Sequence, residues 1–251
     1  MEGLSGMRKP RILIACETSG VVRRAFSRAG ADAWSCDLLP AEDGGQHIQG
    51  DALRALRDDW DALIAHPPCT YLCNSGAHWL GRQPGRMEKL RQGARFFRLL
   101  WRAKIPCVAV ENPIPCYTAA ELIGDRYNQI IQPYEFGEDA SKKTCLWIRG
   151  LPALWRTKFM QPRLICRQCS NAFSFENVFC NCPTCGADAW DAQRRWANQT
   201  DSGQNRVPGG KRQWKERSRT YEGIAAAMAE QWFPVVNLSV KLRTRPGRSA
   251  S

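Results

Sequence analysis

Short apolar runs alternate with longer segments of helical periodicity along the first 150 residues of the chain. Each apolar run is bounded by polar or turn-forming residues, which is typical of strands buried in a sheet. Strands are expected at residues 11–16, 32–37, 61–65, 106–112, 128–132 and 143–148, and helices at 21–29, 52–59 and 88–102. This alternation predicts the α/β class, with a Rossmann-like, mostly parallel sheet covered by helices on both faces.

Polar and potentially reactive residues directly follow four of the predicted strands. They are residues 17–20 after the first strand, Asp37 at the end of the second, residues 66–69 after the third, and Glu111 with Asn112 at the end of the fourth. Because ligands of open parallel sheets bind at the carboxyl ends of the strands, we expect these residues to meet at one edge. Residues 66–69 read HPPC, and the two prolines restrict the backbone in front of Cys69.

The amino-acid composition of the chain changes after residue 150. Residues 8–150 are predicted to form the α/β domain, and residues 151–219, rich in Arg, Trp, Gln and Cys, a separate basic region. Residues 220–234 are predicted to form a C-terminal helix that packs back on the α/β domain. The basic tail at 240–251 is predicted to be disordered.

The net charge and the cysteine content indicate the class of partner and the cellular compartment of the protein. The formal net charge of +12 favours a polyanionic partner, most simply nucleic acid. No apolar run reaches the roughly 18 residues of a membrane span, and the N-terminus lacks the apolar centre of a signal peptide. We therefore expect a cytoplasmic protein without a membrane partner. In a reducing compartment the 12 cysteines are expected to be buried residues, metal ligands or nucleophiles rather than disulfides.

Two Cys-x2-Cys pairs lie in the basic region. Cys166 with Cys169, and Cys182 with Cys185, are separated by twelve residues and can offer four thiolates to one tetrahedral Zn²⁺. We therefore predict a small zinc-ribbon insert, whose metal-binding energy is largely folding energy. Cys180 competes with Cys182 as a ligand, and the sequence leaves that choice open.

Aromatic and basic residues surround the predicted ribbon. Phe173, Phe175 and Phe179 are expected to fill the hairpin between the two cysteine pairs. The basic side chains expected to face a partner are Arg163, Arg167, Arg194, Arg195, Lys211 and Arg212. Trp190, Trp196 and Trp214 lie among basic residues and are candidates for stacking on nucleic-acid bases.

The order of these motifs resembles that of the DNA cytosine-C5 methyltransferase family, especially its compact phage and prophage members. The likeness covers residues 11–148 and the final helix. RILIACETSGVVRRAF, at 11–26, stands in the place of the first cofactor-binding motif, and PPC, ending at Cys69, in that of the nucleophile motif. AWSCDLLP and HIQGD place Asp37 and Asp51 where the family has acidic residues, and Glu111 with Asn112 matches its Glu-Asn pair.

The resemblance implies an S-adenosylmethionine-dependent enzyme that methylates C5 of a cytosine flipped out of double-stranded DNA. Cys69 would be the nucleophile and Glu111 would bind the cytosine edge. The residues implied at the cofactor are Glu17, Gly20, Asp37, Asp51 and Pro67, and those at the substrate are Asn112, Lys142 and Lys143. The zinc ribbon stands where the family has its target-recognition domain. Roles in phage DNA modification and in restriction-modification are both compatible with this reading.

Other functions fit parts of the same pattern. HPPC also matches the first three places of the polar-Pro-Pro-aromatic motif of amino-methyltransferases, which act on N4 of cytosine or N6 of adenine without a thiol. Gly20 stands alone in a loop where the family has more glycine, which favours a non-catalytic DNA-binding protein on a degenerate methyltransferase fold. Transfer of a different group, or action on a free nucleotide, also stays open.

Overall fold

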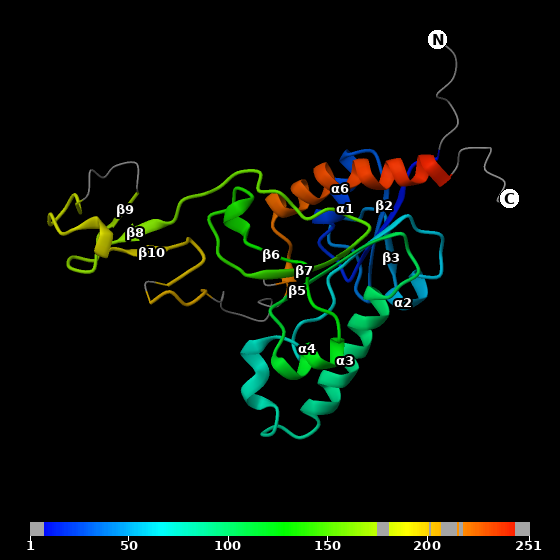
Figure 1. Cartoon of the computed structure of the whole chain (residues 1–251), viewed down its shortest axis with the longest axis horizontal. Coiled ribbons are helices and arrows are strands. Elements are labelled where there is room, and N and C mark those ends of the chain that lie inside the picture. The colour runs from blue at the N-terminus through cyan, green and yellow to red at the C-terminus, as the bar shows by residue number, and fades with distance from the viewer. Residues whose placement is uncertain (1–7, 175–180, 201, 207–214, 216–217, 244–251) are drawn as a thin grey trace, which may run out of the picture. The chain divides into compact units, whose positions relative to one another are not determined.

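The computed structural model describes residues 8–174, 181–200, 202–206, 215 and 218–243 (Figure 1). The chain divides into two compact units. The first unit combines residues 1–131, 143–155 and 225–251, and the second combines 132–142 with 156–224. Among the described residues, no helix has both the length and the apolar character needed to cross a membrane.

A seven-stranded sheet forms the centre of the first unit, in the order β3-β2-β1-β4-β5-β7-β6. The strands are β1 (Arg11–Ala15), β2 (Asp32–Asp37), β3 (His47–Gln49), β4 (Ala62–Ala65), β5 (Cys107–Pro113), β6 (Gln129–Ile131) and β7 (Thr144–Arg149). Neighbouring strands are parallel except at β7, which runs antiparallel to both β5 and β6. The strand order changes direction between β1 and β4, as in doubly wound sheets. The predicted Rossmann-like, mostly parallel fold class is therefore confirmed.

Helices cover both faces of this sheet (Figure 1). One face is covered by α1 (Val21–Arg28) and by the part of α6 (Glu222–Arg243) that belongs to the first unit. The other face is covered by α2 (Ala52–Ala55), α3 (Arg86–Trp101) and α4 (Tyr117–Ile123). The sheet is thus enclosed, which explains why β4 is buried along its whole length.

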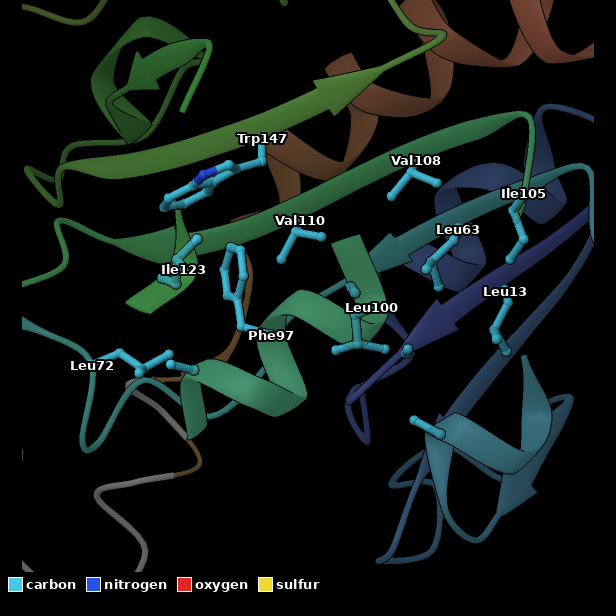
Figure 2. Packing of buried hydrophobic residues seen from close by; sticks show 14 of the residues in the cluster. Leu13, Leu63, Leu72, Phe97, Leu100, Ile105, Val108, Val110, Ile123 and Trp147 are labelled. Atoms are coloured by element: carbon cyan, nitrogen blue, oxygen red, sulfur yellow. The ribbon is translucent and has the colours of Figure 1, made fainter. Parts of the chain in front are cut away.

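The core under α3 and α4 is made of side chains that point to one face of the sheet (Figure 2). Leu63 and Val110 belong to this cluster together with Phe97 of α3, and Phe97 meets Trp147 of β7 edge to face with ring centroids 4.7 Å apart. Removing side chains of this size from water contributes roughly 1.5–3 kcal/mol each. The core therefore fixes the strand ends on which the predicted site residues lie.

Three elements differ from the sequence-based expectation. β3 and α4 are short and were not predicted, and α6 continues through Pro234 to Arg243. Val236 and Val240 are buried beyond that proline, so packing outweighs the backbone hydrogen bond that Pro removes. The predicted disorder is therefore wrong for residues 240–243, and residues 244–251 lie outside the described part of the chain.

The second unit contains a small antiparallel sheet in the order β10-β8-β9. Its elements are η2 (Pro133–Glu135), β8 (Arg163–Ile165), β9 (Ala172–Phe173), η4 (Ala189–Asp191) and β10 (Gln193–Arg195). Leu164 and Phe173 pack against Cys166 and Cys182 in a core of its own.

Several aromatic and basic residues of the predicted ribbon can now be placed. Trp190 is exposed, whereas Trp196 stacks on Tyr134 with centroids 4.3 Å apart and planes 4° from parallel. One face of the Trp196 ring is thus already covered within the second unit. Residues of the prediction that lie outside the described part of the chain are Phe175, Phe179, Lys211, Arg212 and Trp214.

Candidate active site and metal centre

The loops that follow β1 and β4 lie side by side at the carboxyl edge of the sheet. The two strands are parallel neighbours, and the backbone N–H of His66 donates to the carbonyl of Ala15 over 2.9 Å. The strand order reverses between these two strands, which is the point where doubly wound sheets bind ligands. The HPPC turn therefore lies at the topological switch point.

Two side-chain hydrogen bonds join the HPPC turn to the end of β5. His66 Nδ1 lies 2.9 Å from Glu111 Oε2, and Asn112 Nδ2 donates to the carbonyl oxygen of Pro67 over 3.0 Å. The side chains of His66 and Glu111 are 7% and 13% exposed, and Asn112 is 2% exposed. Successive residues of a strand point to opposite faces, so Glu111 and Asn112 hold the turn from two sides. The structure thus brings the predicted residue Glu111 to the turn that ends in Cys69.

The backbone after Cys69 forms a tight turn that is anchored in the core. The N–H groups of Leu72 and Cys73 both donate to the carbonyl of Cys69, over 2.9 and 3.0 Å. Leu72 is fully buried among the residues shown in Figure 2, and its carbonyl accepts from the N–H of Cys116 over 2.7 Å. Cys69 itself is half-buried, and the turn that carries it is hydrogen-bonded to the core through Leu72.

Cys73 begins η1 (Asn74–Trp79) and forms a pair of thiols with Cys69. A hydrogen bond from the Cys69 thiol lowers the pKa of Cys73 most strongly; burial opposes this shift. The Ser75 hydroxyl, 3.1 Å from Cys73 Sγ, and the N–H groups of Ser75 and Gly76 lower it further, to about 5. These donors therefore favour the thiolate form of Cys73.

The first predicted cofactor loop is held by its own side chains. The Glu17 carboxylate accepts from the N–H groups of Val22 and Arg23, over 2.7 and 3.2 Å, and thereby caps α1. Gly20 has φ of 66°, and a Cβ atom there would collide with the Asp43 carboxylate and the Arg23 guanidinium. Glu17 and Gly20 thus set the shape of this loop, and only glycine fits at position 20 without strain.

Asp37 and Asp51 lie close together at the ends of β2 and β3. Burial, together with the charges of both carboxylates, raises the pKa of Cys36 to about 11. Asp37 accepts from the N–H of Leu39 over 3.0 Å, and Asp51 caps α2 by accepting from the N–H of Leu53 over 2.9 Å. The structure therefore brings these two predicted cofactor residues to one edge, next to the loop after β1.

This donor set fits S-adenosylmethionine. An acidic residue at the end of the second strand is the group that binds ribose hydroxyls in doubly wound folds, and Asp37 occupies that position. Asp51 is exposed and adds a second carboxylate that would offset the positive charge of the sulfonium. Both carboxylates are accessible at the edge where such a ligand would bind.

The two predicted lysines fall in different units. Lys143 is exposed and directly precedes β7, whose first residue, Thr144, pairs with Pro113 at the end of β5. Lys142 belongs to the second unit, where its N–H donates to Gln132 Oε1 over 2.9 Å. Lys143 is therefore close to the edge that carries Glu111.

The four predicted zinc ligands converge in the second unit. The Sγ atoms of Cys166, Cys169, Cys182 and Cys185 all lie within 4.8 Å of one another. The Cys166–Cys185 and Cys169–Cys182 sulfur pairs are each 3.6 Å apart. Tetrahedral Zn–S bonds of about 2.3 Å place the sulfurs roughly 3.8 Å apart, so the cluster fits one zinc ion. Cys180 lies outside the described residues.

The two cysteine pairs have matching backbone turns. The N–H of Ser170 donates to the carbonyl of Cys166, and the N–H of Gly186 to that of Cys182, over 3.0 and 2.9 Å. Ser170 and Gly186 both have positive φ, of 59° and 75°. The N–H of Cys169 lowers the pKa of Cys166, which favours the thiolate that zinc requires.

Sequence reasoning left two features of the site unassigned. Cys16 adopts φ of 61° in the loop after β1, and no sequence signal marks a cysteine for that conformation. The pairing of His66 with Glu111 spans 45 residues, so it depends on the neighbouring positions of β4 and β5. The position of His66 at a strand end was the one signal that pointed to a role.

The fold and this edge define a doubly wound α/β protein with a cysteine cluster fit for zinc in its second unit. No protein-family model and no curated protein matches the chain. Among solved structures, the chain is similar to a protein assigned as a DNA modification methyltransferase encoded within an E. coli prophage. The two share 15% sequence identity with a TM-score of 0.38, and the match covers 55% of this chain and 46% of that one.

Two further solved structures are similar to the chain. The Entamoeba histolytica methyltransferase EhMeth has 14% identity and TM-score 0.39, covering 61% of this chain and 58% of that one. The S. pombe Dnmt2 methyltransferase has 15% identity and TM-score 0.38, covering 59% and 52%. The chain spans about half the length of the structures it matches.

Proposed function

We propose that this chain is an S-adenosylmethionine-dependent DNA methyltransferase that modifies C5 of cytosine through a covalent adduct with Cys69. The observation that carries the proposal is the pair of hydrogen bonds that join the HPPC turn to Glu111 and Asn112 at the switch point. A nucleophile and a carboxyl group are thereby supported on neighbouring strand ends, beside the acidic edge formed by Asp37 and Asp51.

A thiol nucleophile overcomes the low reactivity of C5 in cytosine. C5 of cytosine is a weak nucleophile, and addition of a sulfur to C6 shifts the C5–C6 electron pair onto C5 as an enamine. Cys69 forms the S–C6 bond and passes its proton to the neighbouring Cys73 thiolate. After methylation, a water molecule takes the C5 proton, the C5–C6 double bond forms again and the S–C6 bond breaks. The Cys69 thiolate, a good leaving group, is expelled, and N3 returns its proton to Glu111.

Glu111 stabilises the charge that this addition creates. When sulfur adds to C6, negative charge develops at N3 of the ring, and a protonated carboxyl at that edge can donate its proton to N3. Glu111 occurs at the end of β5, mostly buried, where a hydrogen bond is stronger than in water.

The remaining edge residues would hold the cofactor. When bound, S-adenosylmethionine supplies an electrophilic methyl group. Asp37 and Asp51 would hold its ribose and offset its positive charge, and Gly20 keeps the first loop in the shape described above. Pro67, buried in the HPPC turn, would line the same edge.

The substrate class follows from charge and from the target atom. A net charge of +12 favours a polyanion, and a cytosine inside a duplex must be flipped out to meet Cys69. The second unit presents Arg163 and Arg194 as exposed basic residues beside the cysteine cluster. We assign double-stranded DNA as the partner and the zinc-bearing unit as a reduced target-recognition region.

A trapping experiment tests the proposal. DNA that contains 5-fluorocytosine carries no removable proton at C5, so wild-type protein with S-adenosylmethionine should form an adduct that survives denaturing electrophoresis. Cys69→Ser should form none, because the hydroxyl is a far weaker nucleophile. Cys73→Ser, four residues away, keeps the nucleophile and should still form the adduct, but more slowly, because it lacks the thiolate that accepts the Cys69 proton. The two variants together show which sulfur reacts.

Nucleoside mass spectrometry on DNA from cells that express each protein identifies the product. We expect 5-methylcytosine with the wild type and not with Cys69→Ser. N4-methylcytosine or N6-methyladenine that persists in Cys69→Ser would replace the proposal with amino-group methylation. DNA binding without any modified nucleoside, together with no affinity for S-adenosylmethionine in calorimetry, would establish the non-catalytic alternative.

A further inference from the structure

The His66–Glu111 pair is an enclosed titratable pair at the candidate active site. Nδ1 of His66 and Oε2 of Glu111 are 2.9 Å apart, and both side chains are largely buried. Nε2 of His66 is buried as well, and within the described part of the chain it has no hydrogen-bond partner. The imidazole is therefore engaged through one nitrogen, and that nitrogen faces the carboxyl group.

The unpartnered Nε2 indicates which nitrogen carries the proton. A buried N–H without an acceptor is rarer in proteins than an acceptor without a donor. A neutral imidazole that holds its proton on Nδ1 leaves only an acceptor at Nε2 and donates to Glu111 Oε2. The geometry thus favours a fixed tautomer in which His66 is a donor to the carboxyl group.

We propose that His66 is a positioning residue for Glu111, which holds the carboxyl group in one orientation and stabilises it as it gives its proton to the target base. This inference rests on the proposed function. When Glu111 loses its proton to N3 of cytosine, the carboxylate charge appears on a group that already accepts the Nδ1–H. That hydrogen bond becomes charge-assisted only as the reaction proceeds, so it stabilises the transition state more than the ground state.

The neighbours of the pair are consistent with this role. Cys145 lies on β7, and burial and the charge of Glu111 raise its pKa to about 12, so it is a neutral thiol beside the carboxyl group. Asn112 is occupied with the Pro67 carbonyl. Cys69 lies in the same turn as His66, and its proton is directed to Cys73. His66 is the residue of this turn whose side chain lies 2.9 Å from the Glu111 carboxyl group, in the geometry of a hydrogen bond.

Two substitutions of His66 distinguish the effect of its Nδ1–H hydrogen bond from the effect of its ring size. Asparagine places an N–H group close to the position of Nδ1, whereas phenylalanine keeps a ring of similar size without a donor. We expect His66→Phe to lower kcat by roughly 10- to 100-fold, the range of one charge-assisted hydrogen bond, with little change in KM for S-adenosylmethionine. His66→Asn should recover most of that loss and stay within about fivefold of the wild type.

A spectroscopic measurement on the wild-type protein without DNA keeps the test independent of turnover and of variant folding. The chain has three histidines, so ¹⁵N-edited spectra of the imidazoles are simple to assign with His66→Asn. We expect the Nδ1–H tautomer for His66, with a proton protected from exchange that shifts in Glu111→Gln. An Nε2–H tautomer, or a His66→Phe protein with wild-type kcat, would overturn the inference while leaving methylation intact. A wild type that gives the expected tautomer but forms no adduct with 5-fluorocytosine DNA would overturn the proposed function, and with it the catalytic role of His66.

Discussion

At the scale of single residues, the turn after β4 lowers the pKa of Cys73 far below that of an ordinary thiol. Cys73 accepts hydrogen bonds from the Cys69 thiol and the Ser75 hydroxyl, and its pKa falls to about 5. Under the proposed function, this thiolate lies next to the nucleophile Cys69, as an acceptor for its proton.

The rate at which Cys73 is alkylated should show its lowered pKa. Only a thiolate reacts with iodoacetamide, so the alkylation rate of Cys73 should be flat from pH 9 to pH 6 and fall near pH 5. An ordinary thiol would lose about tenfold per unit below its pKa of roughly 8.5. Peptide mass spectrometry after timed alkylation measures the rate at each cysteine. Ser75→Ala should move the midpoint upward, and a Cys73 midpoint near 8.5 in the wild type would contradict the structure.

At the scale of elements, one buried carboxylate connects β1, β4 and α6. Asp61 directly precedes β4, is 1% exposed, and accepts from Arg8 Nη1 over 2.6 Å and from the N–H of Arg11 over 2.8 Å. Arg243, at the end of α6, donates to it over 2.6 Å. Burial raises the pKa of Asp61, but these donors outweigh that effect and lower it.

Replacing this carboxylate should loosen the terminal helix. We expect Asp61→Asn to lower the free energy of unfolding by about 2 kcal/mol at pH 7, because two partly exposed arginines lose a buried acceptor. The lowered pKa means that the contribution is complete above the unfolded pKa of about 3.9 and is lost as pH falls through the folded value. Urea unfolding of both proteins between pH 7 and pH 3 measures the difference. Asp59→Asn, at an 87% exposed position, is the matched control and should be nearly neutral.

At the scale of the whole molecule, the main sheet and the small antiparallel sheet depend on different sources of stability. The first unit has an extended apolar core between its sheet and helices, whereas the cluster at the small sheet of the second unit contains Leu164, Phe173 and two of the four cysteines. A core that small rarely supplies enough stability on its own, so a metal would be needed to hold the ribbon together.

Removal of zinc should therefore affect only the second unit. We expect about one zinc per chain by elemental analysis, and its loss with a chelator or in Cys182→Ser should expose residues 156–224 to limited proteolysis. The fragments of the first unit should stay resistant. Cys180→Ser should retain zinc, because Cys182 already completes the cluster. Zinc loss in Cys180→Ser with retention in Cys182→Ser would reverse the ligand assignment.

Local patterns determined much of this protein in advance. The apolar runs that become β1, β2, β4 and β5 are recognisable because buried parallel strands need continuous hydrophobic residues, and the helix expected at 88–102 appears as Arg86–Trp101. The spacing of the two Cys-x2-Cys pairs likewise predicted the sulfur cluster, because each pair forms its turn from neighbouring residues.

Contacts between distant segments were decided only in three dimensions. The hydrogen bonds of His66 with Glu111 and of Asn112 with Pro67 each span 45 residues and depend on β4 and β5 being neighbours. The continuation of α6 past Pro234 depends on buried valines and on Asp61, 182 residues before Arg243. Sequence periodicity reports what each segment prefers by itself, whereas these features arise from packing and burial, which only the assembled sheet provides.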